Sequence, residues 1–226
     1  TLIIIEKVQP DWVVNCIADT RTNPDDLARY FFINSLFPQL LDYYRSHFNY
    51  RLVHFSSNGV YSGDKNRSYG DRDNPDAKDI YGISKILSEN IKSVIIRTSI
   101  IGHSLNNDAG LLDWFLNTKE KEISGYTKVY WNGITTLVMS KIVGRIIQKN
   151  IAFDNNAVHI ASEKLSKYKL LKLFKDIYKT DTQVNREDGN ISDKTLKPSR
   201  EQKIYFNDLI IPLTDQIKEL KCFYKK

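Results

Sequence analysis

Short apolar runs alternate with helical patterns through the N-terminal half of the chain, and this alternation constrains the fold most. Three runs are of strand type: DWVVNCIA (11–18), YRLVHFSS (50–57) and SVIIRTSIIG (93–102). Between them, residues 23–47 carry apolar side chains at spacings of three and four, and a second helix is predicted around Tyr81. Strands that are apolar on both faces and separated by helices are typical of a buried parallel sheet with right-handed crossovers. We therefore predict an α/β fold with a parallel sheet flanked by helices.

The C-terminal half has a less regular pattern. We predict one short strand at 157–161 and helices at 109–119, 136–149, 166–178 and 213–221. Thr135 or Thr136 should cap the second of these helices, and Ser166 the third. Pro38 should kink or break the long N-terminal helix, and the polar residues 185–203 are predicted to form a loop.

The composition is that of an ordinary globular protein. Apolar residues make up 41% and charged residues 27% of the 226 residues, and no stretch approaches the roughly 18 apolar residues of a membrane span. The net charge of +6 is spread along the chain and mixed with acids, so we expect neither a nucleic-acid nor a membrane partner. Cys16, Cys222 and four scattered histidines lack metal-ligand spacing, so we predict no metal site and a cytoplasmic location.

A tyrosine and a lysine stand four residues apart in DIYGISKILSEN (79–90). In a helix, Tyr81 and Lys85 share a face, about 5–6 Å apart at Cβ. Such a pair alone is most often an ordinary surface pair. Here, however, the polar stretches NCIADT, SSNGVYSG and RTSIIG follow the three predicted strands, and open parallel sheets bind ligands at that edge. A hydroxyl group from SSNGVYSG would meet the Tyr81–Lys85 face across the same crevice.

These motifs, in this order and spacing, resemble the short-chain dehydrogenase/reductase superfamily in its extended, nucleotide-sugar-modifying branch. Within that branch, the chain looks most like the dTDP-4-dehydrorhamnose reductase group. The resemblance covers residues 7–102 and rests on KVQPDWVVNCIADT, VHFSSNGVYSG, YGISK and IIRTSIIG. A looser likeness continues in NGITTLVMSKIV and HIASEKLSKYKLLKLF. The resemblance implies a Rossmann-type fold that binds NADPH or NADH and a nucleotide-diphosphate sugar.

The resemblance also assigns roles to residues at matching positions. Tyr81 would be the proton donor, Lys85 would lower the pKa of Tyr81 and bind the nicotinamide ribose, and Ser57 would hydrogen-bond the substrate carbonyl. A phenol, with a pKa near 10, needs such a neighbouring ammonium ion to act near neutral pH. The expected cofactor-binding residues are Ile17, Ala18, Thr20, Asn34, Ser56, Tyr81, Lys85, Thr98 and Ser99. The expected substrate-binding residues are Asn58, Trp131, Asn132 and Thr135.

Two features depart from this family. The glycine-rich turn that holds the cofactor pyrophosphate is missing from these residues, so we expect it, with the first strands of the sheet, upstream of Thr1. The residue that selects NAD or NADP belongs to that region, and the selection is open. After Ser57, the reductase group usually has an acid and an aromatic residue, where this chain has Asn58 and Gly59. The identity of the sugar is therefore open as well.

We predict that residues 1–103, with about 136–161, form an N-terminally incomplete dinucleotide-binding domain. Residues 104–135 and 162–226 are expected to form a smaller substrate lobe. The expected activity is NAD(P)H-dependent reduction of a nucleotide-linked 4-keto-deoxysugar in surface polysaccharide synthesis, with a homodimer as the assembly. An epimerase or dehydratase of the same fold is the first alternative. The second is a non-catalytic, cofactor-binding regulatory subunit, because the resemblance extends to that of methionine adenosyltransferase.

Overall fold

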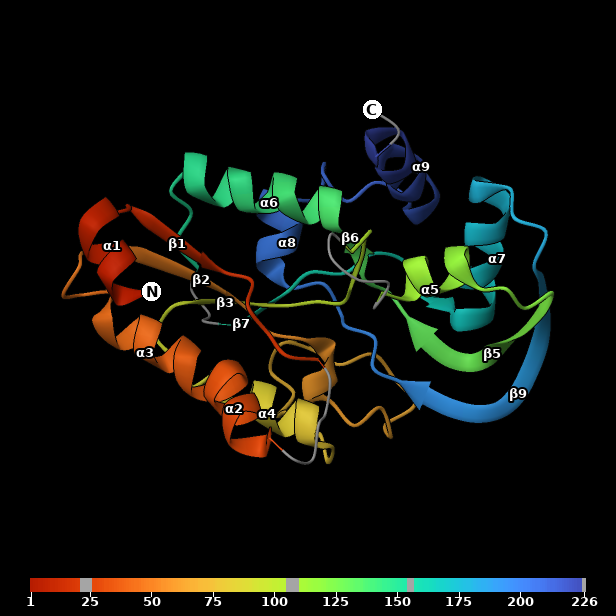
Figure 1. Ribbon diagram of the computed structural model, residues 1–226, viewed down its shortest axis with the longest axis horizontal. Helices are drawn as coiled ribbons and strands as arrows, with labels where there is room; N and C mark the ends of the chain where they lie inside the picture. Colours follow the sequence, from red (N-terminus) through yellow and green to blue (C-terminus); the bar gives the residue numbers. More distant parts are fainter. Residues whose placement is uncertain (21–25, 105–109, 154–156, 225–226) are drawn as a thin grey trace.

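A four-stranded parallel sheet forms the centre of the computed structural model, which describes residues 1–20, 26–104, 110–153 and 157–224 (Figure 1). Its strands, in spatial order, are β1 (Trp12–Asn15), β2 (Arg51–Phe55), β3 (Val94–Arg97) and β7 (Ala157–His159). Successive residues face opposite sides of the sheet, and both sides are apolar, as in the buried pairs Leu52–Val53 and Ile95–Ile96. The predicted α/β fold with a Rossmann-type parallel sheet is confirmed.

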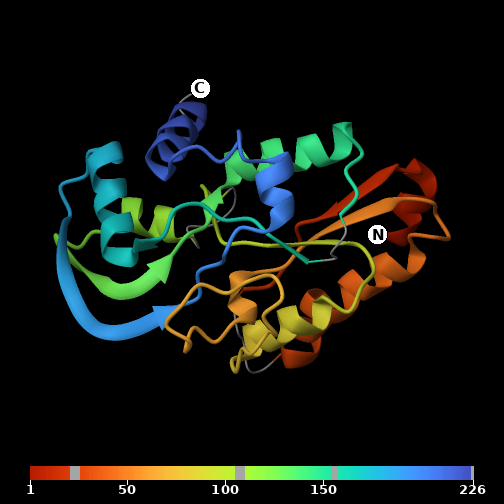
Figure 2. The same ribbon diagram turned by 180° about the vertical axis from the view of Figure 1, so that it is seen from behind.

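Helices cover both faces of this sheet. As two opposite views show, α6 lies on one face and α2, α3 and α4 lie on the other (Figure 1, Figure 2). These helices are α2 (Leu27–Phe31), α3 (Phe37–Tyr44), α4 (Ile80–Ser88) and α6 (Thr136–Gln148). The apolar side of α6 packs on Val53 and Ile96, whereas Leu41 of α3 packs on Leu52 and Ile95. The sheet is therefore the middle layer of three, and its polar strand ends form one edge of the layer.

The predicted helix at 23–47 is helical over residues 27–44, in three joined segments, and residues 23–25 lie outside the described part of the chain. A π-helical turn, η2 (Phe32–Leu36), connects α2 to α3. Pro38, which was predicted to kink or break this helix, lies in the first turn of α3, directly after the π-helical turn. Proline has no N–H group to bond the carbonyl four residues earlier, and the wider π turn fits that missing bond. The start of α2 is capped by Asp26, whose carboxylate accepts a hydrogen bond from the Arg29 N–H at 3.2 Å.

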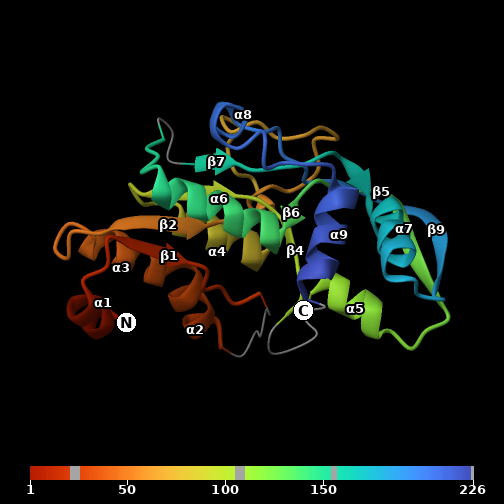
Figure 3. The same ribbon diagram turned by 90° about the horizontal axis from the view of Figure 1, so that it is seen from above.

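A second sheet of three strands lies beside the first (Figure 3). Its strands, in spatial order, are β8 (Leu165–Ser166), β5 (Glu122–Trp131) and β9 (Gln183–Asp193). The helices α5 (Leu111–Asn117), α7 (Lys167–Tyr178) and α9 (Leu213–Tyr224) share a separate apolar core with it. That core includes Leu112, Phe115, Trp131, Phe174 and Leu213.

The strands β5 and β9 correct the sequence prediction, which placed 185–203 in a loop and no strand at 122–131. β9 runs parallel to β5, from Gln183 opposite Glu122 to Asp193 opposite Tyr130. More than half of its residues are exposed and most are polar, so the segment lacks the apolar signal of a buried strand. The same segment leads into α8 (Arg200–Tyr205), which packs against β7.

Short elements complete the chain. They are α1 (Leu2–Val8), the 3-10 turn η3 (Asn58–Val60), and a parallel pair formed by β4 (Ile100–Ile101) and β6 (Ile134–Thr135). As predicted, Thr135 caps α6 and Ser166 caps α7, each accepting a backbone hydrogen bond at 3.3 Å. Within the described ranges, no helix combines the length and the apolar character needed to cross a membrane.

Candidate active site

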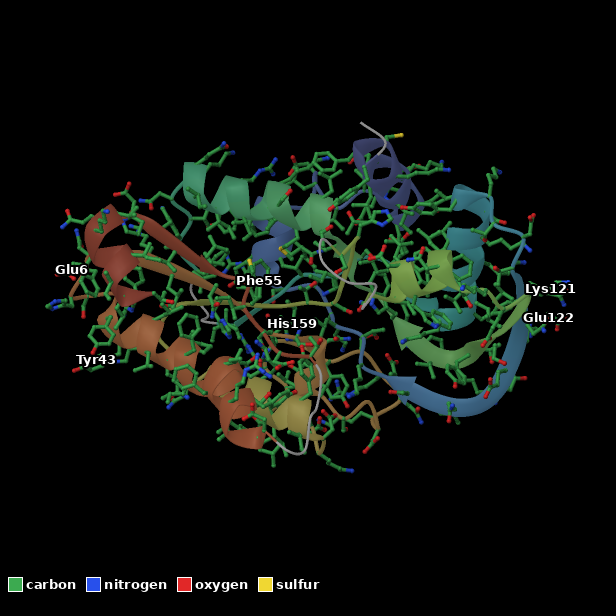
Figure 4. The ribbon with its side chains drawn as sticks, viewed as in Figure 1. Glu6, Tyr43, Phe55, Lys121, Glu122 and His159 are labelled. Carbon is green, nitrogen blue, oxygen red and sulfur yellow. The ribbon has the colours of Figure 1, made fainter. Side chains whose placement is uncertain are left out.

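Ser57, Tyr81 and Lys85 meet where β2 ends and α4 begins. α4 starts after Asp79, whose carboxylate accepts a hydrogen bond from the Gly82 N–H at 2.8 Å. The Ser57 side chain interacts with the Tyr81 phenol and lowers its pKa, and both side chains lie against Gly59. Lys85 Nζ donates to the carbonyl oxygen of Phe55 at 2.7 Å. Phe55 lies near the middle of the molecule, whereas Glu122 marks the far tip of β5 (Figure 4). The three residues expected to be catalytic therefore lie together at the carboxyl end of the sheet.

Gly59 lets the Tyr81 ring reach Ser57. A Cβ atom at Gly59 would lie 2.8 Å from Tyr81 Cε1 and 3.1 Å from Ser57 Oγ, so a side chain there would displace one of them. Gly82 is also tightly packed, since a Cβ atom there would lie 2.5 Å from the Gly59 carbonyl oxygen. The departure from the family at Gly59 thus brings the phenol ring onto the loop after β2.

Burial controls the ionisation of both titratable groups in this trio. Lys85 is 1% exposed, and burial lowers its pKa to about 8, although the nearby Glu89 carboxylate raises it. Burial raises the pKa of Tyr81, the hydrogen bond from Ser57 lowers it, and the Asp79 charge raises it. Lys85 is not among the causes of this shift, so the expected lowering of the Tyr81 pKa by Lys85 stays a prediction. Burial dominates, and the ammonium group is directed at the Phe55 carbonyl.

Asn34 of η2 fixes the loop after β1. Its Oδ1 accepts a hydrogen bond from the Asp19 N–H at 2.8 Å, and its Nδ2 donates to the Asp19 carbonyl at 2.7 Å and to Ser84 Oγ at 3.2 Å. Asn34 is fully buried, so it supports the loop and does not reach a cofactor, which corrects its place among the expected contacts. The other expected contacts of this loop are exposed, and they are Ile17, Ala18 and Thr20.

The hydroxyl groups of three expected cofactor contacts bond to the protein itself. Ser56 Oγ donates to Glu89 Oε1 at 2.5 Å, and Thr98 Oγ1 donates to the Ile160 carbonyl at 2.8 Å. Ser56 and Thr98 are 7% and 4% exposed, and their contact with a cofactor stays a prediction. Ser99 Oγ accepts a hydrogen bond from Trp131 Nε1 at 2.7 Å, but Ser99 is partly exposed and stays a candidate contact.

Most of the expected substrate contacts have packing or capping roles. Asn132 bonds both ends of its amide to the backbone of Leu196, at 2.7 and 3.0 Å. Thr135 is fully buried at the start of α6, and Trp131 is buried in the core of the second sheet. The polar groups of these three residues are bonded within the protein, and their contact with a substrate stays a prediction. Asn58 is partly exposed, donates to a backbone carbonyl after β9 at 3.1 Å, and stays a candidate.

The sequence analysis missed a buried network behind the site. Arg97, at the end of β3, binds Glu89 through Nε to Oε1 at 2.9 Å and Nη2 to Oε2 at 2.6 Å. Its Nη1 donates to the Tyr61 hydroxyl at 2.8 Å, and that hydroxyl contacts His159 Nε2 at 3.1 Å. Burial and the Arg97 charge lower the pKa of His159 to about 4, so this imidazole is neutral near pH 7. The spacing of four between Lys85 and Glu89 was a usable signal for Glu89.

Metal ligands do not gather around these residues. In the part of the chain that the structure describes, no group of three or more His, Cys, Asp or Glu side chains could hold a metal ion. Cys16 and Cys222 are both exposed and form no disulfide. The groups that the site offers are a hydroxyl, a phenol and an ammonium group.

Solved structures share this fold. A dTDP-4-dehydrorhamnose reductase from Clostridium acetobutylicum ATCC 824 is 17% identical, with 99% of this chain and 84% of that chain covered and a TM-score of 0.83. The reductase of the same description from Bacillus anthracis, in complex with NADP, is 16% identical, with 98% and 83% covered and a TM-score of 0.83. A UDP-glucose 4-epimerase from Thermotoga maritima, with UDP-glucose, is 16% identical, with 99% and 82% covered and a TM-score of 0.76.

The family follows from a direct match of the sequence. No curated protein matches the chain. A family model described as the RmlD substrate binding domain, however, matches residues 2–188, which are most of the chain and include Ser57, Tyr81 and Lys85. The protein therefore belongs to the RmlD substrate binding domain family.

Proposed function

We propose that the protein is an NAD(P)H-dependent reductase of a nucleotide-linked 4-keto-deoxysugar. The single observation that carries this proposal is the meeting of Ser57, Tyr81 and Lys85 at the carboxyl end of the parallel sheet. The family match and the shared fold with dTDP-4-dehydrorhamnose reductases support it. The product would enter surface polysaccharide synthesis.

The two hydroxyl groups have complementary tasks. Ser57 donates a hydrogen bond to the carbonyl oxygen of the substrate, and Tyr81 transfers its proton to the same oxygen. Because burial raises the pKa of Tyr81, the phenol keeps its proton near neutral pH until the substrate oxygen becomes basic. NAD(P)H, when bound, supplies the hydride for the carbonyl carbon. The Lys85 ammonium group, one turn along α4, stabilises the phenolate that Tyr81 leaves behind.

The surroundings of Lys85 fit a nicotinamide ribose. Among the described residues, its ammonium group makes one hydrogen bond, to the Phe55 carbonyl, so two N–H donors remain for ribose hydroxyls. Ile17 and Ala18 are exposed at the end of β1, at the sheet edge where open parallel sheets bind dinucleotides. The B. anthracis reductase holds NADP. We propose NADPH or NADH as the cofactor.

We assign the sugar nucleotide to the proposed substrate lobe, residues 104–135 and 162–226. Contacts join this lobe to the catalytic loop. Asn58 Nδ2 donates to the Lys194 carbonyl at 3.1 Å, and Tyr69 forms a β-bridge with Leu196. A sugar held by this lobe would therefore lie beside Ser57. The T. maritima epimerase holds UDP-glucose, which supports a nucleotide-diphosphate carrier.

The test follows nicotinamide oxidation in the complete protein with a panel of 4-keto sugar nucleotides. Turnover that consumes NADPH or NADH is expected, with competition by at least one of dTDP, UDP, GDP and CDP at millimolar concentration. Tightly held NAD that is never consumed, with exchange of sugar stereochemistry, would indicate an epimerase. Cofactor binding without any turnover would indicate the regulatory subunit and would overturn the reductase.

We also propose a homodimer in the cytoplasm. Phe32 and Leu36 of η2 and Ile83 and Leu87 of α4 are between 39% and 48% exposed, and the two elements pack against each other. Residues four apart share a helix face, so the four side chains form one apolar surface. Light scattering should give the mass of two chains for the wild type and of one chain for Leu87→Glu.

The exposed, unpaired cysteines suit a reducing compartment such as the proposed cytoplasm.

A further inference from the structure

The last residue of β2 and the two residues after it contact two residues of α4 and the residue that caps its C-terminus, three positions that are each one helical turn apart. The pairs are Phe55 with Lys85, Ser56 with Glu89, and Ser57 with Tyr81. Because helix positions four apart lie on the same face, the strand end is fastened to α4 along two turns. We call these three contacts the strand–helix clamp. Two of its three helix residues belong to the proposed catalytic trio, and the third, Glu89, does not.

Glu89 is the most firmly held part of the strand–helix clamp. Its Oε1 accepts hydrogen bonds from Ser56 and from Arg97 Nε, and its Oε2 accepts one from Arg97 Nη2. The side chains of Glu89 and Arg97 are each 8% exposed. A two-point Arg–carboxylate pair fixes geometry as well as charge, and Arg97 belongs to β3, the neighbour of β2. Glu89 therefore holds α4 against two strands at once.

The Glu89 charge also acts on Lys85. Burial lowers the pKa of Lys85 to about 8, and Glu89 opposes that effect. The other titratable groups that face Lys85 are Tyr81 on its own helix and His54 on β2. Burial and the Lys85 charge lower the pKa of His54 to about 3, so His54 is neutral and brings no compensating charge. Arg97 lies beyond Glu89 and is paired with it.

We propose that Glu89 is a positioning residue of the active site, which sets α4 against the end of β2 and places a carboxylate one helical turn from the Lys85 ammonium group. This inference rests on the proposed function. It adds a residue that touches neither substrate nor cofactor and acts through Ser56 and Lys85. A purely structural Glu89 would support folding without affecting the ionisation of Lys85.

The first experiment measures the titration of Lys85 by NMR in the complete protein, labelled with ¹³C at lysine Cε. The resonance of Lys85 is identified by its absence from Lys85→Met. In Glu89→Gln, the midpoint should fall by about one pH unit or more, because a neighbouring opposite charge typically shifts a pKa by 1–3 units. The pH at which kcat falls on the alkaline side of its pH profile should decrease by the same amount. Glu219→Gln is the matched control, because Glu219 pairs with Lys141 at the surface, and it should move neither.

An unchanged Lys85 titration in a folded Glu89→Gln variant would overturn the proposal, even if its thermal midpoint falls. The titration needs no turnover, so it decides the role of Glu89 even where the wild type reduces no keto sugar. A wild-type protein that reduces no keto sugar would refute the proposed function, but it would not refute the role of Glu89.

A second variant decides the matter if Glu89→Gln does not fold. Ser56→Ala removes one contact of the strand–helix clamp and leaves the Glu89–Arg97 pair intact. The pKa of Tyr81, followed through ¹³C at tyrosine Cζ, should then rise, because the Ser57 interaction that lowers this pKa is weakened. The value of kcat should fall while KM changes little, and Ser56→Thr should restore both. Wild-type behaviour of Ser56→Ala would refute positioning through Ser56.

Discussion

Lys85→Met should stabilise the folded protein near neutral pH while it removes the proposed function. Lys85 is 1% exposed, and its pKa falls from 10.5 to about 8 because burial takes the ammonium group out of water. At about 1.4 kcal/mol per pKa unit, this shift costs the folded state roughly 3 kcal/mol at pH 7. Methionine has a similar length, and losing the hydrogen bond to Phe55 costs about 1 kcal/mol. The variant should therefore be more stable by about 2 kcal/mol.

The pH dependence of this gain has a definite sign. Between pH 8 and 10.5 the unfolded chain binds more protons at Lys85 than the folded protein does, so wild-type stability rises with pH through that window. By about pH 10 the remaining cost is roughly 1 kcal/mol, and the two proteins should be equally stable. The Lys85 charge also lowers the pKa of His54, but burial is the larger cause, so His54 is neutral in both proteins across this pH window and does not affect the comparison.

Urea denaturation followed by circular dichroism, at pH 7 and pH 10, measures the two free energies of unfolding. Lys141→Met is the control, because Lys141 is an exposed lysine paired with Glu219, and such pairs contribute about 0–1 kcal/mol. A Lys85→Met variant that is less stable than wild type at pH 7, or a gap that does not shrink by pH 10, would refute the reasoning. A destabilised variant would mean that the ammonium group is well solvated or better paired than its burial indicates.

Three further outcomes are expected. Tyr81→Phe keeps the ring and should fold normally, but turnover should fall on the order of 10²–10⁴-fold, measured as nicotinamide oxidation, because a proton donor is lost; equal turnover would contradict the role. Gly59→Ala places a methyl group against the Tyr81 ring and Ser57 and should lower kcat. Gly144→Ala is the control, because Gly144 lies in a helix with open space around it. Thermal denaturation should show that this variant has a free energy of unfolding higher by up to about 1 kcal/mol, and its kcat should be unchanged. Thr135→Val should cost about 1 kcal/mol of stability through the lost cap and leave KM for the sugar nucleotide unchanged; a raised KM would identify Thr135 as a substrate contact.

The first sheet was predictable because its strands are buried on both faces. Pairs such as Val13–Val14 and Ile95–Ile96 place adjacent apolar residues on opposite sides, a pattern that sequence reasoning recognises directly. The caps of α6 and α7 were predictable because a threonine or serine side chain satisfies a local N–H group, whatever the rest of the fold does.

The second sheet and the environment of the site depend on contacts between distant segments. β9 is a strand because β5 supplies its backbone partners, while its own side chains are polar and largely exposed. The spacing of Tyr81 and Lys85 fixed a shared helix face but not the depth of burial, which sets the direction of both pKa shifts. Asn132 has a partner 64 positions away in Leu196, and no local pattern marks such a bond.

The parallel pairing of β5 with β9 has a consequence for the order of folding. Glu122 pairs with Gln183 and Tyr130 with Asp193, and two parallel strands cannot be joined by a tight hairpin. The intervening chain, including α6, β7 and α7, must be ordered or looped out before this ladder can close, and contacts so distant along the chain slow folding. Refolding should therefore pair β1, β2 and β3 first, and the longer-range pairs of β3 with β7 and of β5 with β9 later. The proposed substrate lobe would then become native last, so a partly folded chain could have the proposed catalytic trio in place before the lobe that is proposed to hold the sugar.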